Sequence, residues 1–136
     1  MAKLPPGYRG WQLISVAHDE GNLNNIRAIL GNGVAIKAYQ DGKLPFPDGA
    51  IVARLAWSHV PSQENNQAFA SPQSFVPVAP TNVQFMVKNL REYASTGGWG
   101  FGQFNGGKPT HVAVQDCFSC HVPVKYRDFV FTRYAP

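Results

Sequence analysis

Cysteine is scarce in this chain: its 136 residues contain two, and both lie within residues 117–120. Long apolar runs are absent as well. Because a helix needs about 20 consecutive apolar residues to cross a bilayer, no membrane-spanning helix is expected. Charged residues make up only 15% of the chain, and the net charge of +4 comes from scattered lysines and arginines. Because nucleic-acid-binding proteins gather such charge in a patch, no nucleic-acid interface is expected. No long segment has helical apolar periodicity, which disfavours a helical bundle.

The residues that are present suit one globular domain. A length of 136 residues lies within the range of a single domain, which we expect to span residues 1–136. The 44% content of hydrophobic residues is ordinary for a domain with its own core. The 12% content of aromatic residues would help to bury a large flat ligand.

The two cysteines belong to the most informative segment, Cys117-Phe118-Ser119-Cys120-His121. This is the spacing that attaches a c-type haem. On a short helix, the two intervening residues place both sulfurs on one face, one turn apart. Each thiol then adds across a haem vinyl group, and the adjacent imidazole coordinates the iron. We therefore predict one covalent haem c per chain, held by Cys117 and Cys120 with His121 as the proximal ligand.

Three other interpretations of the cysteine pair stay open. A structural zinc site usually needs two such pairs, and the chain has no further cysteine. A thioredoxin-like redox pair would lie early in a βαβ pattern, whereas this pair lies near the C-terminus. A disulfide between the two thiols would close only a very small loop. Haem attachment is the preferred interpretation.

The start of the chain bears on the compartment. Residues 1–6 lack the apolar region of a signal peptide. In bacteria, however, c-type haem is attached outside the cytoplasm. The simplest expectation is a mature chain to which Met1 was added, located in the periplasm.

Short local patterns predict an α+β fold, namely a mostly antiparallel sheet with a few short helices. β-Branched, aromatic or alternating runs predict strands at residues 12–17, 25–30, 50–60, 83–87, 99–104 and 128–134. Helical turns are expected at residues 8–11, 34–41, 90–94 and 116–121. The polar, proline-rich stretch 61–80 is expected to be a long loop.

Further motifs occur in a fixed order and are together more specific than the haem motif alone. They are Tyr8-Arg9-Gly10-Trp11, Ile26-Arg27, Phe46-Pro47-Asp48-Gly49-Ala50, Phe85-Met86-Val87-Lys88-Asn89, Thr96-Gly97-Gly98-Trp99-Gly100-Phe101 and Phe129-Val130-Phe131-Thr132-Arg133-Tyr134. With the haem motif, they make the chain resemble the cytochrome P460 family and its relative cytochrome c′-beta, almost from end to end. The resemblance implies a mostly antiparallel β fold, commonly a homodimer, with one haem per subunit. It also implies small nitrogen ligands or substrates such as hydroxylamine and nitric oxide.

Two positions depart from the members of that family that oxidise hydroxylamine. Those members carry a lysine covalently linked to the haem edge, and this chain has Arg54 at the corresponding position. A guanidinium stays protonated and is a poor nucleophile, so Arg54 would instead pair with a haem propionate or lie on the surface of a strand. Those members also use a distal carboxylate, where this chain has Gln84, which cannot titrate. Arg27 matches a pocket arginine of the family; the alternative is a solvent-facing strand residue.

The sequence leaves the sixth iron position open. Met86 would share a strand face with Gln84, so it is either an iron ligand, as in electron-transfer cytochromes, or a core methionine. His18, His59 and His111 are weaker candidates because surface positions suit them better. Candidates for the walls of the haem pocket are Phe46, Phe75, Phe85, Trp99, Phe101 and Phe104.

Two functions are compatible with these residues. Arg54 and Gln84 favour a periplasmic cytochrome that binds nitric oxide or carbon monoxide, or passes electrons to a redox partner protein. The alternative is an oxidoreductase that converts hydroxylamine to nitrogen oxides, but proton removal would then lack its acceptor. We therefore expect an apolar distal pocket with few hydrogen bonds and no general base, and no efficient hydroxylamine oxidation.

Overall fold

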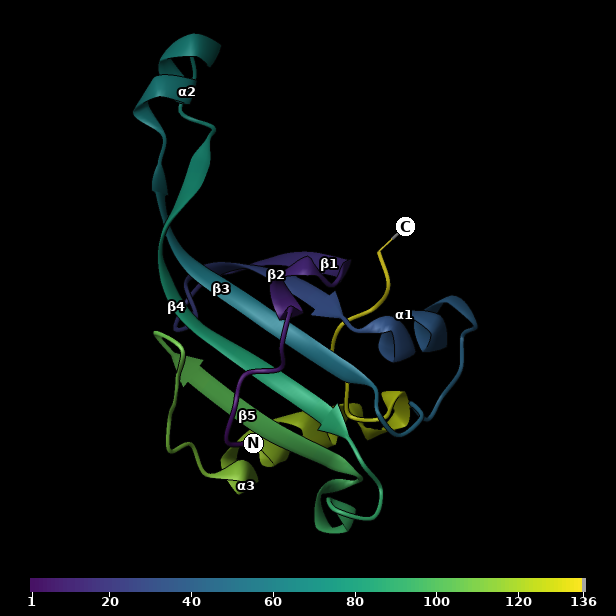
Figure 1. Ribbon diagram of the computed structural model, residues 1–136. Coiled ribbons are helices and arrows are strands. Elements are labelled where there is room, and N and C mark those ends of the chain that lie inside the picture. Colours follow the sequence, from purple (N-terminus) through teal and green to yellow (C-terminus); the bar gives the residue numbers. More distant parts are fainter. Residues whose placement is uncertain (136) are drawn as a thin grey trace.

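One antiparallel sheet forms the centre of the molecule. The computed structural model describes residues 1–135 (Figure 1). The six strands lie side by side in their chain order, and each pairs antiparallel with the next. They are β1 (Gln12–Asp19), β2 (Asn25–Gly31), β3 (Ile51–Pro61), β4 (Phe75–Lys88), β5 (Trp99–Asn105) and β6 (Lys108–Pro109). The predicted α+β fold, built as a single domain on a mostly antiparallel sheet, is confirmed.

The helices are short. They are α1 (Gly33–Gln40), α2 (Gln63–Phe69) and α3 (Val114–His121), with 3₁₀ turns η1 (Tyr8–Gly10), η2 (Ala94–Thr96) and η3 (Val122–Arg127). The side-chain oxygen of Asn32 accepts hydrogen bonds from the backbone N–H groups of Ala35 and Ile51, both at 3.0 Å. Asn32 therefore caps α1 and ties it to the start of β3. No helix within residues 1–135 has the length and hydropathy that a bilayer crossing requires.

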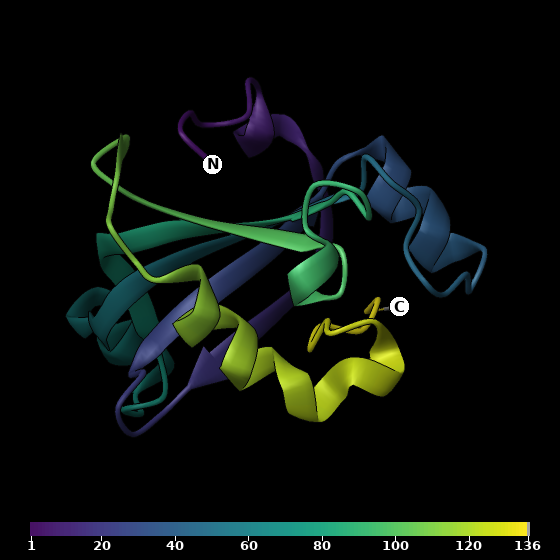
Figure 2. The ribbon, with the colours of Figure 1, turned by 90° about the horizontal axis from the view of Figure 1, so that it is seen from below.

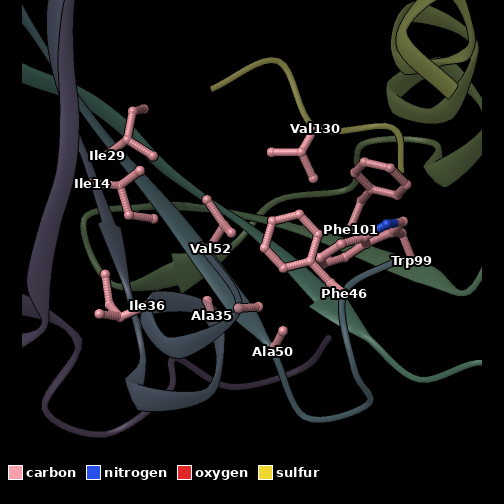
Figure 3. Close-up of a cluster of buried hydrophobic side chains, with 11 residues drawn as sticks. Ile14, Ile29, Ala35, Ile36, Phe46, Ala50, Val52, Trp99, Phe101 and Val130 are labelled. Atoms are coloured by element: carbon pink, nitrogen blue, oxygen red, sulfur yellow. The ribbon is translucent and has the colours of Figure 1, made fainter. Parts of the chain in front are cut away.

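The sheet separates two hydrophobic clusters, because successive strand residues point to opposite faces. On one face, the ring of Phe85 packs edge-to-face against Tyr8 and Phe104, at centroid distances of 5.3 and 5.7 Å. The N-terminal segment thus covers this face, while α3 and the C-terminal segment lie on the other (Figure 2). The cluster on the second face includes Ile14, Ile29, Phe46, Val52, Trp99, Phe101 and Val130 (Figure 3).

The prediction of a long loop over residues 61–80 is wrong. The β3–β4 ladder continues as far as Pro61 opposite Phe75, and α2 connects the two strands at the tip of the hairpin. This hairpin projects from the rest of the molecule (Figure 1). Pro77 and Pro80 lie opposite irregularities in the ladder register. A proline is tolerated at such bulges, because its missing N–H breaks no regular ladder bond.

The predicted helix at residues 90–94 is also wrong, since turns and then η2 occupy this connection. The chain has to return directly to β5, and the N–H of Gly98 bonds back to the carbonyl of Tyr93 at 2.8 Å. Gly97 and Gly98 both have positive φ, at 66° and 84°, which stops helical propagation.

The predicted strand at residues 128–134 does not form. Asp128 and Phe129 have φ values of 52° and 65°, in the left-handed region, which turns the chain out of the extended direction. The segment instead crosses the second face of the sheet, and its end is tied to β1 by a bond from Ala135 N–H to the Ile14 carbonyl (2.9 Å). The other predicted strands and helical turns are confirmed; their boundaries differ by one or two residues, except that β4 begins at Phe75 rather than at residue 83.

Candidate functional site

A cavity of about 830 Å³ is bounded by the sheet, helix α3 and the C-terminal segment. This volume lies in the usual range of ligand pockets, about 300–1,000 Å³. Much of its wall is apolar and includes Ile29, Val52, Met86, Phe101 and Val130. The cavity can therefore take a large, mainly apolar ligand.

Helix α3 brings the cysteine motif to this cavity. Cys117, Cys120 and His121 all line it, and the two cysteines are not joined by a disulfide. Because the cysteines are three positions apart on α3, they share one helix face. Burial raises the pKa of the Cys117 thiol, and the negative charge of nearby Asp116 raises it further. Both effects favour the thiol over the thiolate.

The C-terminal segment orients His121. Its Nδ1 lies 2.7 Å from the carbonyl oxygen of Phe129. Since a carbonyl only accepts, Nδ1 carries the proton and Nε2 is left free. The imidazole ring packs between Phe101 and Phe131, at centroid distances of 5.2 and 5.0 Å. Burial lowers the pKa of His121 and the bond to Phe129 raises it by less, which favours the neutral imidazole that ligates metals.

Two arginines form a polar part of the wall. Arg27 Nε lies 2.7 Å from a carboxylate oxygen of Asp19, and Arg54 Nη2 donates to Asn82 Oδ1 at 2.6 Å. The buried Nη2 of Arg27 and Nε of Arg54 have no hydrogen-bond partner among residues 1–135. Burial, together with the Arg27 charge, lowers the pKa of Arg54 to about 10, and Asp19 offsets part of this. Two guanidiniums beside one carboxylate leave a positive charge that an anionic group would neutralise.

Gln84 and Met86 lie on the same face of β4, as the strand alternation predicted, and both line the cavity. Gln84 lies opposite Arg54 in the β3–β4 ladder, and its Nε2 donates to Gln103 Oε1 at 2.5 Å. Met86 also packs against the hydrophobic cluster of the second face. Its position is thus compatible with a sulfur ligand and with a core side chain.

The wall residues that the sequence-based reasoning missed include Asp19, Gln103 and Phe131. Asp19 lies just beyond the strand expected at residues 12–17, but β1 extends to it, and alternation along β1 places it on the same face as Ala17, which also lines the cavity. This part of the wall therefore carries a carboxylate, while the expectation of an apolar distal pocket with few hydrogen bonds and no general base stays a prediction. Phe131 was assigned to a strand that does not form.

Seven other candidates lie outside the cavity wall: His18, His59, His111, Phe46, Phe75, Trp99 and Phe104. His18 and His59 pack against each other, with ring centroids 5.0 Å apart. Within the described part of the chain, no three His, Cys, Asp or Glu side chains cluster as a metal site would require. The zinc interpretation of the cysteine pair therefore gains no support.

The wall residues fit a haem. Two cysteines on one helix face and an imidazole whose Nε2 is available are the donor set of a covalently attached haem. The apolar wall suits the macrocycle, and the unpartnered guanidinium N–H groups suit its carboxylates.

Comparison with known proteins agrees with this chemistry. The chain matches the model of the cytochrome P460 family over residues 5–132, a stretch that includes every predicted site residue from Arg27 to His121. No curated protein matches the chain.

Proposed function

The chain belongs to the cytochrome P460 family, and from this premise we propose that it is a mono-haem c-type cytochrome that binds small ligands such as nitric oxide or carries electrons. Family membership implies a covalently bound haem. The observation that carries the proposal is the state of His121: the Phe129 carbonyl occupies Nδ1 at 2.7 Å, so the free nitrogen is Nε2, on a residue that lines the cavity beside Cys117 and Cys120.

In this proposal, Cys117 and Cys120 hold the group through two thioether bonds. Each bond forms when the S–H adds across a vinyl double bond: sulfur bonds one carbon, hydrogen goes to the other, and no oxidant is consumed. His121 is the proximal ligand through Nε2. When bound, the haem supplies an iron that takes up an electron or a small ligand. Arg54 and Arg27 bind its propionates through their unpartnered N–H groups.

The side chains of β4 shape the ligand side of the site. Gln84 can donate or accept a hydrogen bond but cannot take up a proton. The role of Met86 decides between the two forms of the proposal. If its sulfur binds the haem iron, the protein would be an electron carrier; if it is a core side chain, the sixth coordination position of the iron would be open to an external ligand. Arg54 lacks the nucleophilic amine that a third covalent link to the haem would need.

Asp19 supports the alternative function, oxidation of hydroxylamine to nitrogen oxides. Its carboxylate is a proton acceptor on the cavity wall: Oδ2 lies 2.7 Å from Arg27 Nε, but that Nε donates its hydrogen bond to Asn25, and Oδ2 has no hydrogen-bond partner among residues 1–135. If Asp19 acts as the base, the wild-type protein will oxidise hydroxylamine and Asp19→Asn will lose about 10²–10⁴-fold in rate. Our proposal expects no efficient turnover in either protein.

The proposal extends to the setting of the protein. We expect a homodimer, because the family resemblance implies one, and a periplasmic location, because c-type haem is attached outside the cytoplasm in bacteria. An electron-carrying form would also need a redox partner protein. Sedimentation equilibrium of the purified holoprotein tests the dimer. A molar mass equal to one chain with one haem would contradict it.

An absorption spectrum of the ferrous holoprotein, taken with and without nitric oxide, tests the proposal. An ordinary c-type spectrum that changes on addition of nitric oxide is expected, with an intact mass of one chain plus one haem. A strongly red-shifted Soret band would indicate a further covalent link and support the alternative. Haem that acid acetone extracts freely would refute covalent attachment.

A further inference from the structure

A deeply buried ion pair lies outside the cavity wall. The side chain of Lys88, at the end of β4, is 1% exposed, and that of Asp128 is 8% exposed. The Lys88 Nζ donates to both carboxylate oxygens of Asp128, at 2.7 and 2.9 Å, and to the carbonyl of Gly97 at 3.1 Å. Desolvation largely offsets the attraction within a buried ion pair. Net stability is therefore a weak reason for this arrangement.

Asp128 connects separate parts of the chain. Its Oδ2 accepts from the backbone N–H of Phe46 at 2.8 Å, and its backbone carbonyl accepts from Trp99 Nε1 at 2.7 Å. Asp128 and Phe129 form two successive left-handed residues, with φ values of 52° and 65°. Residues with side chains rarely adopt this conformation, and they keep it only where surrounding contacts hold them.

The left-handed turn aims the Phe129 carbonyl at Nδ1 of His121, at 2.7 Å. On the other side of the turn, Gly97 approaches the Phe129 ring so closely that a Cβ at this position would lie 2.3 Å from it. Lys88 therefore binds two residues that fix the turn: it donates to the carboxylate of Asp128, which is in the turn, and to the carbonyl of Gly97, which packs against the Phe129 ring.

We propose that Lys88 and Asp128 are positioning residues for the axial histidine. The pair holds the turn whose carbonyl fixes the ring orientation of His121 and the strength of its Nδ1 hydrogen bond, and thereby sets the reduction potential of the haem. A strong Nδ1 bond raises the basicity of the imidazole as a ligand, which favours the ferric state. The inference rests on the proposed function, since it takes His121 as the iron ligand.

The test compares variants of the holoprotein by two readouts. One is the midpoint potential, and the other is the Fe–His stretching band in resonance Raman spectra of the ferrous protein after photolysis of its carbon monoxide adduct. Lys88→Met removes the charge and keeps an apolar side chain. Asp128→Asn keeps an oxygen acceptor and a residue type that tolerates positive φ, so it remains informative if Lys88→Met folds poorly.

Two controls separate positioning from general effects. Lys37→Met removes an exposed ion pair, because Lys37 lies 2.9 Å from Asp41 on the surface of α1. Leu55→Ala lowers stability without touching the turn, because Leu55 is 4% exposed in the cluster on the opposite face of the sheet.

Both pair variants should raise the midpoint potential, with the reduction equilibrium constant increasing about threefold to tenfold, and should lower the Fe–His frequency. The controls should leave both readouts unchanged. If Lys88→Met and Asp128→Asn lower the free energy of unfolding but leave the midpoint potential and the Fe–His frequency unchanged, the pair is purely structural. That result would overturn the inference and leave the proposed function intact. A wild-type protein without a His-ligated Fe–His band would overturn the proposed function and the inference with it.

Discussion

Replacing Gly97 by alanine should perturb the turn that holds the Phe129 carbonyl. The new Cβ would lie 2.3 Å from Cε2 of Phe129, whereas ordinary van der Waals contact begins at 3.4 Å, so the ring would have to move by about 1.1 Å. That ring is already constrained by Phe118, whose centroid lies 5.3 Å away. Overpacking of this kind costs about 1–3 kcal/mol. The positive φ of 66° adds about 1–2 kcal/mol for a residue with a Cβ.

We therefore expect Gly97→Ala to lower the free energy of unfolding of the holoprotein by about 2–5 kcal/mol, measured by urea unfolding. Gly21→Ala is the matched control: its φ is 67°, and no atom lies within 4 Å of an added Cβ. This control should lose only the conformational part, about 1–2 kcal/mol. Equal losses in the two variants would show that the Phe129 ring yields without cost, and would refute the reasoning.

The remaining predictions concern attachment, the distal sulfur and a helix cap. Cys117→Ser and Cys120→Ser should each leave one thioether bond, seen as a shifted pyridine haemochrome band, and an unshifted band in either would contradict attachment through that cysteine. Met86→Ala should convert a low-spin spectrum to high-spin and lower the reduction potential if the sulfur ligates the iron. If Met86 is a core residue, the spectrum should be that of the wild type and the free energy of unfolding should fall by about 2–5 kcal/mol. A variant with wild-type spectrum and wild-type stability would contradict both roles. Asn32→Ala should lower the free energy of unfolding by about 0.5–2 kcal/mol in urea, because it removes the cap of α1 and the bond to Ile51; full stability would show that water replaces the cap.

Local patterns were sufficient for much of the fold. The alternation that predicted the strand at residues 99–104 depends on neighbours two positions apart, so β5 could be recognised without its partners. The haem motif on α3 is likewise local, because the helix itself places the two cysteines on one face. Alternation also put Gln84 and Met86 on a common face, and the structure places both on the cavity wall.

The errors lie where contacts between distant segments decide the conformation. Residues 61–80 look like a loop because they are polar and rich in proline, yet pairing with β3 extends β4 back to Phe75, and α2 forms at the tip of the hairpin. Residues 128–134 have a strand-like composition, yet the contacts of Asp128 with Lys88 and Phe46 hold a left-handed turn there. Such tertiary contacts override local propensity.

The sequence by itself determined the cysteine–histidine motif and the strand pattern, since each depends on residue type and short spacing. Only the tertiary structure decided that Asp19 reaches the cavity beside Arg27, and that the Phe129 carbonyl engages His121. The physical reason is that an ion pair or a hydrogen bond depends on atoms brought within about 3 Å. Residues far apart in the chain reach that distance only when the sheet and the C-terminal segment pack together.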